Sequence, residues 1–285
     1  MSALLFSSLD DECASPITLS NRALSYGDGV FEALRVIDQA VPLIDYHRAR
    51  FLRGVEVLKL GSAVDLLRLF DEALEQALVK LASLDHQDGL VKVFGIRAAG
   101  GRGYAPATPC YAEVYFQVYE SPHYPSNYAQ TGIEVACCAH RLSEQPALAG
   151  IKHLNRLDQV MASMELGELP EGLVCDQSGR VIEGTKSNVL MFVGDEIVTP
   201  CLSRSGVRGT MLSALLAGEL LGYSVTEGDI AFEQLMNADS VAMVNSVFGL
   251  WPVIRIEDAE FKVSQKCRSL QSAMVERFGF VYEAH

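Results

Sequence analysis

Residues 150–160 read GIKHLNRLDQV and place one lysine, Lys152, between the apolar Ile151 and a predicted helix over 155–167. Apolar surroundings disfavour an ammonium ion, so a lysine there has a lowered pKa and a usable amine nucleophile. The same letters also fit an ordinary, partly exposed lysine ahead of a helix. The rest of the sequence has to decide between these two interpretations.

Composition narrows the class of protein. The chain has 285 residues, of which 49% are hydrophobic and 21% charged, and its net charge is −13. Broad nucleic-acid binding is not expected, because neutralising phosphates requires a basic face. The N-terminus lacks a basic region followed by an apolar core, and no apolar run is long enough to span a membrane. These patterns predict a soluble, cytoplasmic protein without nucleic-acid or membrane partners.

The seven cysteines show no metal-binding or disulfide pattern. They form no C-x-x-C pair, and no Cys/His group has the spacing of a zinc site. Buried, reduced thiols are therefore expected, with no metal.

The order of patterns predicts an α+β chain of two domains. A smaller α/β domain is expected over 1–120, a Pro- and Ser-containing linker over 121–132, and a larger, strand-rich domain over 133–285. In the first domain, 29–37 and 40–44 look like a hairpin, Asp45 like the cap of the next helix, and Ser62 like the cap of another.

The second domain shows many short strand patterns and three helices. Strands are predicted over 133–139, 171–176, 180–184, 189–193, 196–199, 223–227, 238–244 and 250–256. Helices are predicted over 155–167, 208–221 and 262–279.

Four further features could carry chemistry. Glu183 ends a predicted strand, where a carboxylate can hold a proton on a heterocyclic nitrogen. Residues 199–212 lead into a helix start at Val207 and Arg208, which could bind an anion through backbone N–H groups. Ser246 lies between two strands, and Arg50 lies on a predicted helix; either could contact a phosphate. Each feature also has a purely structural explanation, as a turn, a cap or a surface charge.

Together these residues are the set that pyridoxal 5′-phosphate (PLP) needs: a lysine, a ring-nitrogen partner and a phosphate anchor. The chain resembles the fold-type IV PLP enzymes, a family that includes branched-chain and D-amino-acid aminotransferases and aminodeoxychorismate lyase. The stretches that carry the resemblance are SYGDGVFEALRV, DYHRARFLRGVEVL, LAGIKHLNRLDQVMA, VIEGTKSNVLMF, TPCLSRSGVRGTML and NSVFGLWPV. They occur in the family's order and cover most of the chain.

The resemblance implies a role for each candidate residue. It implies that Lys152 carries PLP and acts as the catalytic base, and that Glu183 pairs with the pyridine nitrogen. It also implies phosphate contacts, made by Arg50, by Val207 and Arg208 through their backbone, and by Ser246 with the adjacent Val247. Arg208 departs from the aminotransferases, which commonly have a hydroxyl residue there.

RAAGGRGYAP and LAGIKHLNRL look most like the aminodeoxychorismate lyase branch. That branch converts 4-amino-4-deoxychorismate to 4-aminobenzoate and pyruvate. Its substrate has two carboxylates, for which Arg97 and Arg102 are the candidate partners, with Tyr26 and Tyr104 as hydroxyl donors. A glycine-rich hairpin loop with solvated arginines explains the same letters.

Alternatives remain open at this point. One is an aminotransferase of the same fold, against which Leu157 counts because branched-chain aminotransferases have a tyrosine there. Another is a PLP-binding protein without turnover. The resemblance further implies a homodimer.

Overall fold

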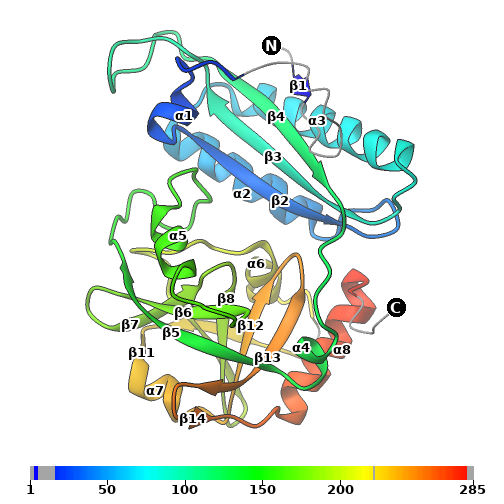
Figure 1. The fold of residues 1–285 in the computed structure, drawn as a ribbon, viewed down its shortest axis with the longest axis vertical. Coiled ribbons are helices and arrows are strands. Elements are labelled where there is room, and N and C mark those ends of the chain that lie inside the picture. The colour runs from blue at the N-terminus through cyan, green and yellow to red at the C-terminus, as the bar shows by residue number, and fades with distance from the viewer. Residues whose placement is uncertain (1–2, 6–16, 221, 281–285) are drawn as a thin grey trace. The chain divides into compact units, whose positions relative to one another are not determined.

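The structure, a computed structural model, describes residues 3–5, 17–220 and 222–280. The chain divides into two compact units (Figure 1): Met1–Pro122 with Ile151–Asn155, and His123–Gly150 with Arg156–His285. The boundary after Pro122 falls within the expected linker, in which a short helix, α4 (Asn127–Gln130), also forms. The segment 151–155 groups with the first unit, although the sequence pattern predicted one continuous second domain.

The first unit is a four-stranded sheet with two long helices on one face (Figure 1). Its strand order is β1-β4-β3-β2, with β1 parallel to β4 and the other neighbours antiparallel. The strands are β1 (Ala3–Leu5), β2 (Gly29–Val36), β3 (Gly89–Arg97) and β4 (Ala112–Tyr119); the helices are α1 (Arg22–Tyr26), α2 (Ile44–Leu58) and α3 (Ala63–Ser83).

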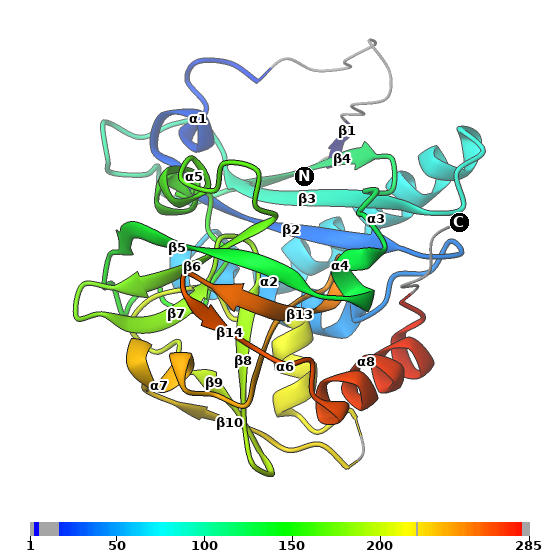
Figure 2. The same ribbon diagram turned by 60° about the horizontal axis from the view of Figure 1, so that its bottom comes forward.

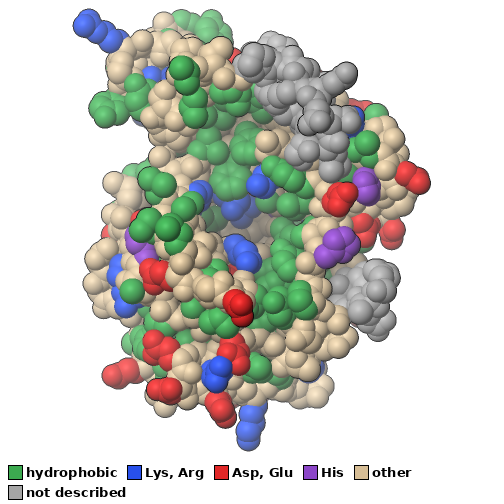
Figure 3. Space-filling view, in the orientation of Figure 1, with side chains coloured by type: hydrophobic (Ala, Val, Ile, Leu, Met, Phe, Trp, Pro, Cys, Tyr) green, Lys and Arg blue, Asp and Glu red, His purple; other side chains and the backbone are tan. Residues whose placement is uncertain are grey.

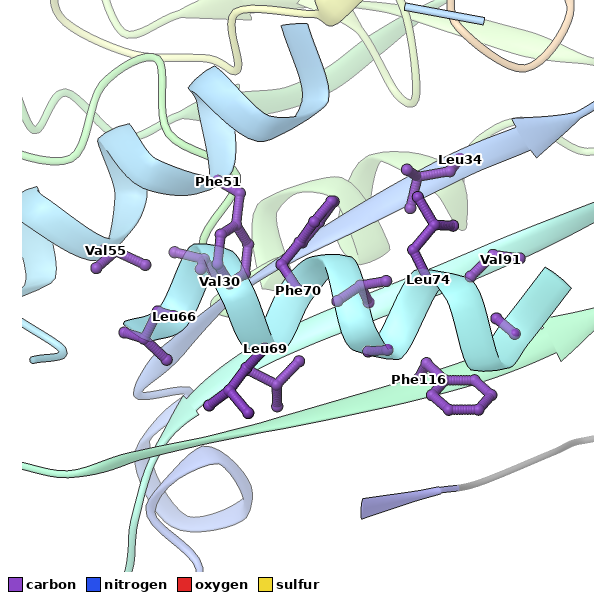
Figure 4. Packing of buried hydrophobic residues seen from close by; sticks show 14 of the residues in the cluster. Val30, Leu34, Phe51, Val55, Leu66, Leu69, Phe70, Leu74, Val91 and Phe116 are labelled. Atoms are coloured by element: carbon purple, nitrogen blue, oxygen red, sulfur yellow. The ribbon is translucent and has the colours of Figure 1, made fainter. Parts of the chain in front are cut away.

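The core of this unit forms where the apolar stripe of α3 meets the sheet. Leu66, Leu69, Phe70 and Leu74 recur at helical spacing and are buried against the strands, as Figure 4 shows. The predicted cap at Ser62 is confirmed, because its hydroxyl accepts a hydrogen bond from a backbone N–H in the first turn.

The predicted hairpin of 29–37 with 40–44 is wrong. Strand β2 instead pairs over its whole length with β3, from Gly29 opposite Ile96 to Val36 opposite Gly89. Only Ile37 and Ala40 form an isolated bridge, and Ile44 already begins α2. Asp45 therefore lies in the first turn of the helix, and Leu43 occupies the cap position. Strand β3, which is distant in sequence but long enough to pair with all of β2, takes the place of the short neighbouring segment 40–44.

The second unit is built on one large mixed sheet (Figure 2). Its strand order is β10-β9-β8-β12-β13-β5-β6-β7-β11, and β14 pairs with β13. The strands are β5 (Ile133–Leu142), β6 (Glu171–Asp176), β7 (Arg180–Gly184), β8 (Asn188–Val193), β9 (Glu196–Pro200), β10 (Val225–Gly228), β11 (Ile230–Ala231), β12 (Ser240–Asn245), β13 (Gly249–Ile256) and β14 (Ala259–Glu260).

The central strands explain the strand-rich sequence of this unit. Every residue of β6 is buried, as are nearly all residues of β8 and β12, which is typical of strands covered on both faces. The predicted strands all form, with ends that differ by no more than a few residues. The expected α+β class is confirmed.

The helices of the second unit are shorter than the sequence pattern predicted. The three predicted helices are α5 (Leu157–Ser163), α6 (Thr210–Leu216) and α8 (Gln265–Phe278). The unit also contains α4 and the short α7 (Phe232–Met236), which were not predicted. The α5 helix begins two residues later than predicted, because Asn155 belongs to the segment that pairs with the first unit. Ser264 caps α8 by accepting from the N–H of Cys267.

Surface charges of both signs are interspersed over the face shown in Figure 3. Some form exposed pairs, such as Arg204 with Asp229, which contribute little stability. Six cysteines carry free thiols, and Cys13 lies outside the described residues. Within the described part of the chain, no acidic, His and Cys side chains group into a metal site, and no helix combines the length and apolar character that crossing a membrane requires.

Candidate active site

Lys152 lies on a short segment that pairs with the edge of β2. The N–H of Phe31 donates to the carbonyl of Lys152 at 3.0 Å, and the N–H of Leu154 donates to the carbonyl of Gly29 at 3.0 Å. Gly29 is required for this approach, since an added Cβ would lie 2.9 Å from the Leu154 side chain and 2.7 Å from the carbonyl of Gly95. The segment is therefore held as an extra strand-like partner of β2.

The amine of Lys152 lies over an aromatic ring. Its Nζ is 4.4 Å from the centroid of the Phe31 ring, within the range of a cation–π interaction. Phe31 and Lys152 are both half-buried. The first interpretation of GIKHLNRLDQV, an amine held against apolar surface, thus fits the structure better than a lysine free in solvent.

Three ionisable side chains lie close together between β2 and α2. Arg50 donates from Nε to Glu32 Oε1 at 2.8 Å and from Nη2 to Glu32 Oε2 at 2.5 Å. His47 Nδ1 lies 2.6 Å from the same Oε2. Glu32 and His47, which the sequence analysis missed, are 1% and 0% exposed, and the side chain of Arg50, which it named, is 11% exposed.

The protonation states in this group follow from burial and charge. Burial by itself would raise the pKa of Glu32, but the charge and hydrogen bonds of Arg50 and the hydrogen bond of His47 lower that pKa to about 2. Burial lowers the pKa of His47, and the charges of Arg50 and Lys152 lower it further, against the opposing effect of Glu32. A neutral His47 that donates from Nδ1 to an ionised Glu32 satisfies both groups.

One of the four predicted substrate-binding residues, Arg97, pairs with an acidic side chain, Asp28. Its Oδ2 accepts from Nε of Arg22 at 2.8 Å and from Nε of Arg97 at 2.9 Å. Arg97 also donates to the carbonyls of Leu58 and Lys59 and to the sulfur of Cys110. All three guanidinium nitrogens of Arg97, a residue only 8% exposed, therefore contact protein groups.

The other three predicted residues are more exposed. The loop between β3 and β4 carries Arg102 and Tyr104, and Arg22 holds this loop through the carbonyls of Gly103 and Tyr104, at 3.0 and 2.9 Å. Tyr104 is 86% exposed and Tyr26 39%, and their rings lie 5.3 Å apart. The loop residues Arg102 and Tyr104, and Tyr26 at the end of α1, are therefore exposed to solvent.

In the second unit, Glu183 lies at the end of β7 and is 4% exposed. Gln159 donates from Nε2 to Oε1 of Glu183 at 3.0 Å, and the backbone N–H of Val207 donates to Oε2 at 2.7 Å. Arg156 is nearby: burial lowers its pKa, while the charge of Glu183 opposes that shift. The carboxyl group is therefore buried and held from two sides.

The loop before α6 passes directly over this carboxylate. An added Cβ at Gly206 would lie 2.8 Å from Ile182 and 3.2 Å from Oε2 of Glu183, so only glycine fits. Its φ of +81° also favours glycine. On the same loop the buried hydroxyl of Ser205 finds no hydrogen-bond partner within the described residues. Gly206 thus lets the backbone reach the carboxylate that Val207 binds.

The predicted phosphate donors are already engaged by protein groups. The N–H of Val207 binds Glu183, and the N–H of Arg208 donates to the carbonyl of Gly150 at 3.1 Å. The side chain of Arg208 pairs with Glu227, and the N–H of Val247 donates to the side chain of Asn245 at 2.9 Å. Ser246, 9% exposed, lies at the turn between β12 and β13.

Comparison with known proteins places these residues in a family context. Residues 29–256 match the family described as amino-transferase class IV. The chain is 31% identical to an aminodeoxychorismate lyase of Vibrio harveyi over 252 residues, which cover 87% of this chain and 90% of that protein.

Solved structures show the same fold. A 4-amino-4-deoxychorismate lyase from Pseudomonas aeruginosa superposes with a TM-score of 0.85 at 35% identity, covering 94% of this chain and 97% of the other. A hypothetical aminotransferase from Mycobacterium tuberculosis, in its PLP-bound form, superposes with a TM-score of 0.78 at 18% identity, covering 93% and 94%. The predicted fold, with a smaller N-terminal part and a larger, strand-rich C-terminal part, is confirmed.

Proposed function

Because this chain belongs to the class IV aminotransferase family, we propose that it is a PLP-dependent aminodeoxychorismate lyase that converts 4-amino-4-deoxychorismate to 4-aminobenzoate and pyruvate. The observation that carries the proposal is the likeness to two lyases at 31% and 35% identity, over nearly the whole length of each. It is supported by RAAGGRGYAP and LAGIKHLNRL, which resemble that branch of the family.

The chemistry of the side chains fits PLP. An aldehyde needs an amine, a pyridine nitrogen needs a buried anion, and a phosphate needs cations and hydroxyl groups. Lys152, Glu183 and Arg50 supply the amine, the buried acid and a cation, and the buried hydroxyl of Ser205, for which the described residues offer no partner, is a further donor. Ser246 supplies a further hydroxyl. The N–H groups of Val207, Arg208 and Val247 would have to exchange their protein partners to bind phosphate.

We propose the following roles. Bound PLP supplies an electron sink and a carbonyl that the substrate amine can join. Lys152 would hold the cofactor through its amine, and the same amine would take the proton from the amine-bearing carbon of the substrate and return one to the departing group. Glu183 holds the proton on the pyridine nitrogen, and the bonds from Gln159 and Val207 keep its carboxylate in place. Formation of the aromatic ring drives the loss of pyruvate.

The loop with Arg102 and Tyr104 is the proposed site for the substrate carboxylates, together with Tyr26. For Arg97, whose nitrogens bind protein groups, we propose that it holds this loop in place through Asp28. An arginine suits a carboxylate because its guanidinium donates two parallel hydrogen bonds.

The proposal includes a homodimer, which follows from the family resemblance, and a cytoplasmic location, which follows from the sequence patterns described above. Light scattering of the purified protein at working concentration tests the dimer, and a fully active monomer would contradict it.

The direct test of the function is a product assay. Purified protein with aminodeoxychorismate should release 4-aminobenzoate and pyruvate in equal amounts, without any keto acid. Amino transfer from leucine or D-alanine to 2-oxoglutarate, with no 4-aminobenzoate formed, would instead establish an aminotransferase. Bound PLP with neither activity would establish a binding protein without turnover. Leu157, 76% exposed where branched-chain aminotransferases have a tyrosine, favours the first outcome.

A further inference from the structure

Glu32 occupies a core position of its strand. Along β2 the side chains alternate, and Val30 and Leu34, two residues to either side of Glu32, are 2% and 0% exposed. Glu32 lies on the same face and is 1% exposed. A carboxylate in the middle of an apolar face is costly unless charge partners surround it. An apolar side chain would pack equally well at this position, so core packing alone does not explain the presence of Glu32.

The partners of Glu32 come from one face of α2. His47 and Arg50 are three residues apart and therefore neighbours on the helix surface. Arg50 binds side-on, with Nε on one carboxylate oxygen and Nη2 on the other. This two-point contact fixes the plane of the guanidinium as well as its position.

His47 supplies a further hydrogen bond to the carboxylate of Glu32 without adding a charge. It lies 2.6 Å from Oε2 of Glu32 and is fully buried, and its lowered pKa keeps the ring neutral. A second cation at this position would repel Lys152, whose charge already acts on His47. A neutral donor therefore orients Glu32 and leaves its negative charge to balance Arg50.

Another arginine on the same helix provides a contrast. Arg48 pairs with Asp71 at 2.9 Å and with Asp45, and its side chain is 37% exposed. The side chain of Arg50 is 11% exposed, and its partner is buried. Arg48 behaves as a surface charge, whereas Arg50 is held from the interior with its orientation set.

We propose that Glu32 and His47 are positioning residues that fix the orientation of Arg50 for the phosphate group of the cofactor. The inference rests on the proposed function, in which Arg50 binds that phosphate. Neither residue needs to contact the cofactor; both act through the guanidinium.

The test compares two ligands that differ only in the phosphate. The full chain, freed of cofactor, is titrated with PLP and with pyridoxal, and both dissociation constants are measured by absorbance. Replacing Glu32→Gln should weaken PLP binding about tenfold or more, the effect of losing one charge-assisted contact. Pyridoxal binding should change by less than about twofold. Asp71→Asn, which removes the surface partner of Arg48, is the matched control and should leave both constants unchanged.

A second pair of variants keeps the test decisive if Glu32→Gln fails to fold. His47→Asn retains a side-chain donor for Glu32, and His47→Leu does not. Both replace a neutral side chain with another neutral one, so the net charge of the group stays the same. We expect the leucine variant to lose PLP affinity selectively and the asparagine variant to retain most of it. Equal losses in both would overturn the role of His47.

The outcomes also separate this inference from the proposed function. If Arg50→Ala abolishes the preference for PLP over pyridoxal but Glu32→Gln leaves that preference intact, Arg50 binds phosphate and only the positioning role is overturned. A parallel loss of both ligands in Glu32→Gln would mean a general structural role and would also overturn it. If the wild-type chain shows no preference for PLP over pyridoxal, the proposed function and this inference fail together.

Discussion

Replacing Asp28→Asn should destabilise the first unit by about 3 kcal/mol. Asp28 is the shared counter-ion of Arg22 and Arg97, which are 5% and 8% exposed. Each charge-assisted hydrogen bond contributes about 1.5–3 kcal/mol, and removing one partner leaves the others as buried, uncompensated charges. Carbonyl groups still bind both arginines in the variant, which is why we expect a loss near the lower limit for two such bonds.

The assay is unfolding in denaturant, followed by two signals. The single tryptophan, Trp251, lies in the second unit, so its fluorescence reports that unit, while far-UV circular dichroism reports both. Asp28→Asn should shift only the circular dichroism transition of the first unit. Asp45→Asn is the matched control, because it also removes an acid paired with an arginine, but one whose side chain is 87% exposed. That control should lose no more than about 0.5 kcal/mol.

A loss below about 1 kcal/mol in Asp28→Asn would refute the reasoning, because it would show that Arg22 and Arg97 are held well enough without their counter-ion. For the same reason, the variant Arg97→Ala would not measure a direct contact between Arg97 and the substrate. The variant removes contacts to Asp28, Leu58 and Lys59, so a loss of substrate binding would arise through the loop and would accompany a loss of stability.

The remaining predictions concern the proposed chemistry and the buried acid. Borohydride reduction of the yellow protein should fix PLP to Lys152, and a label on Lys92 or Lys186 would overturn that assignment. Glu183→Gln should retain PLP but lose most lyase activity, because an amide cannot hold the pyridinium proton; turnover at the wild-type rate would make Glu183 a bystander. The pKa of Glu32 is lowered from 4.5 to about 2, so its ionised form contributes about 3 kcal/mol that is present above pH 4.5 and lost as the pH falls to about 2. Acid titration of the first unit should therefore be less steep over this range in Glu32→Gln, and an unchanged acid transition would show that Glu32 does not contribute.

The sequence by itself determined the features that depend on near neighbours. Alternation and apolar runs marked the strands of the second unit, and the hydroxyl of Ser62 marked a helix start, because these signals need only the next few residues. The motifs around Lys152 and Glu183 could also be recognised from the sequence, because a family resemblance depends only on the order of residues along the chain.

The tertiary structure alone decided which distant groups meet. It paired β2 with β3 rather than with 40–44, and it grouped residues 151–155 with the first unit. Glu32 was visible in the sequence as an acid that interrupts the apolar alternation of β2. Only the folded chain shows that Arg50 balances its charge and that His47 hydrogen-bonds to it. Arg97 was predicted to bind a substrate carboxylate, with a solvated loop arginine as the alternative, and only the fold shows that backbone carbonyls bind its guanidinium. Strand pairing and the burial of charge depend on partners far along the chain, and a local pattern does not encode which partner is closest in space.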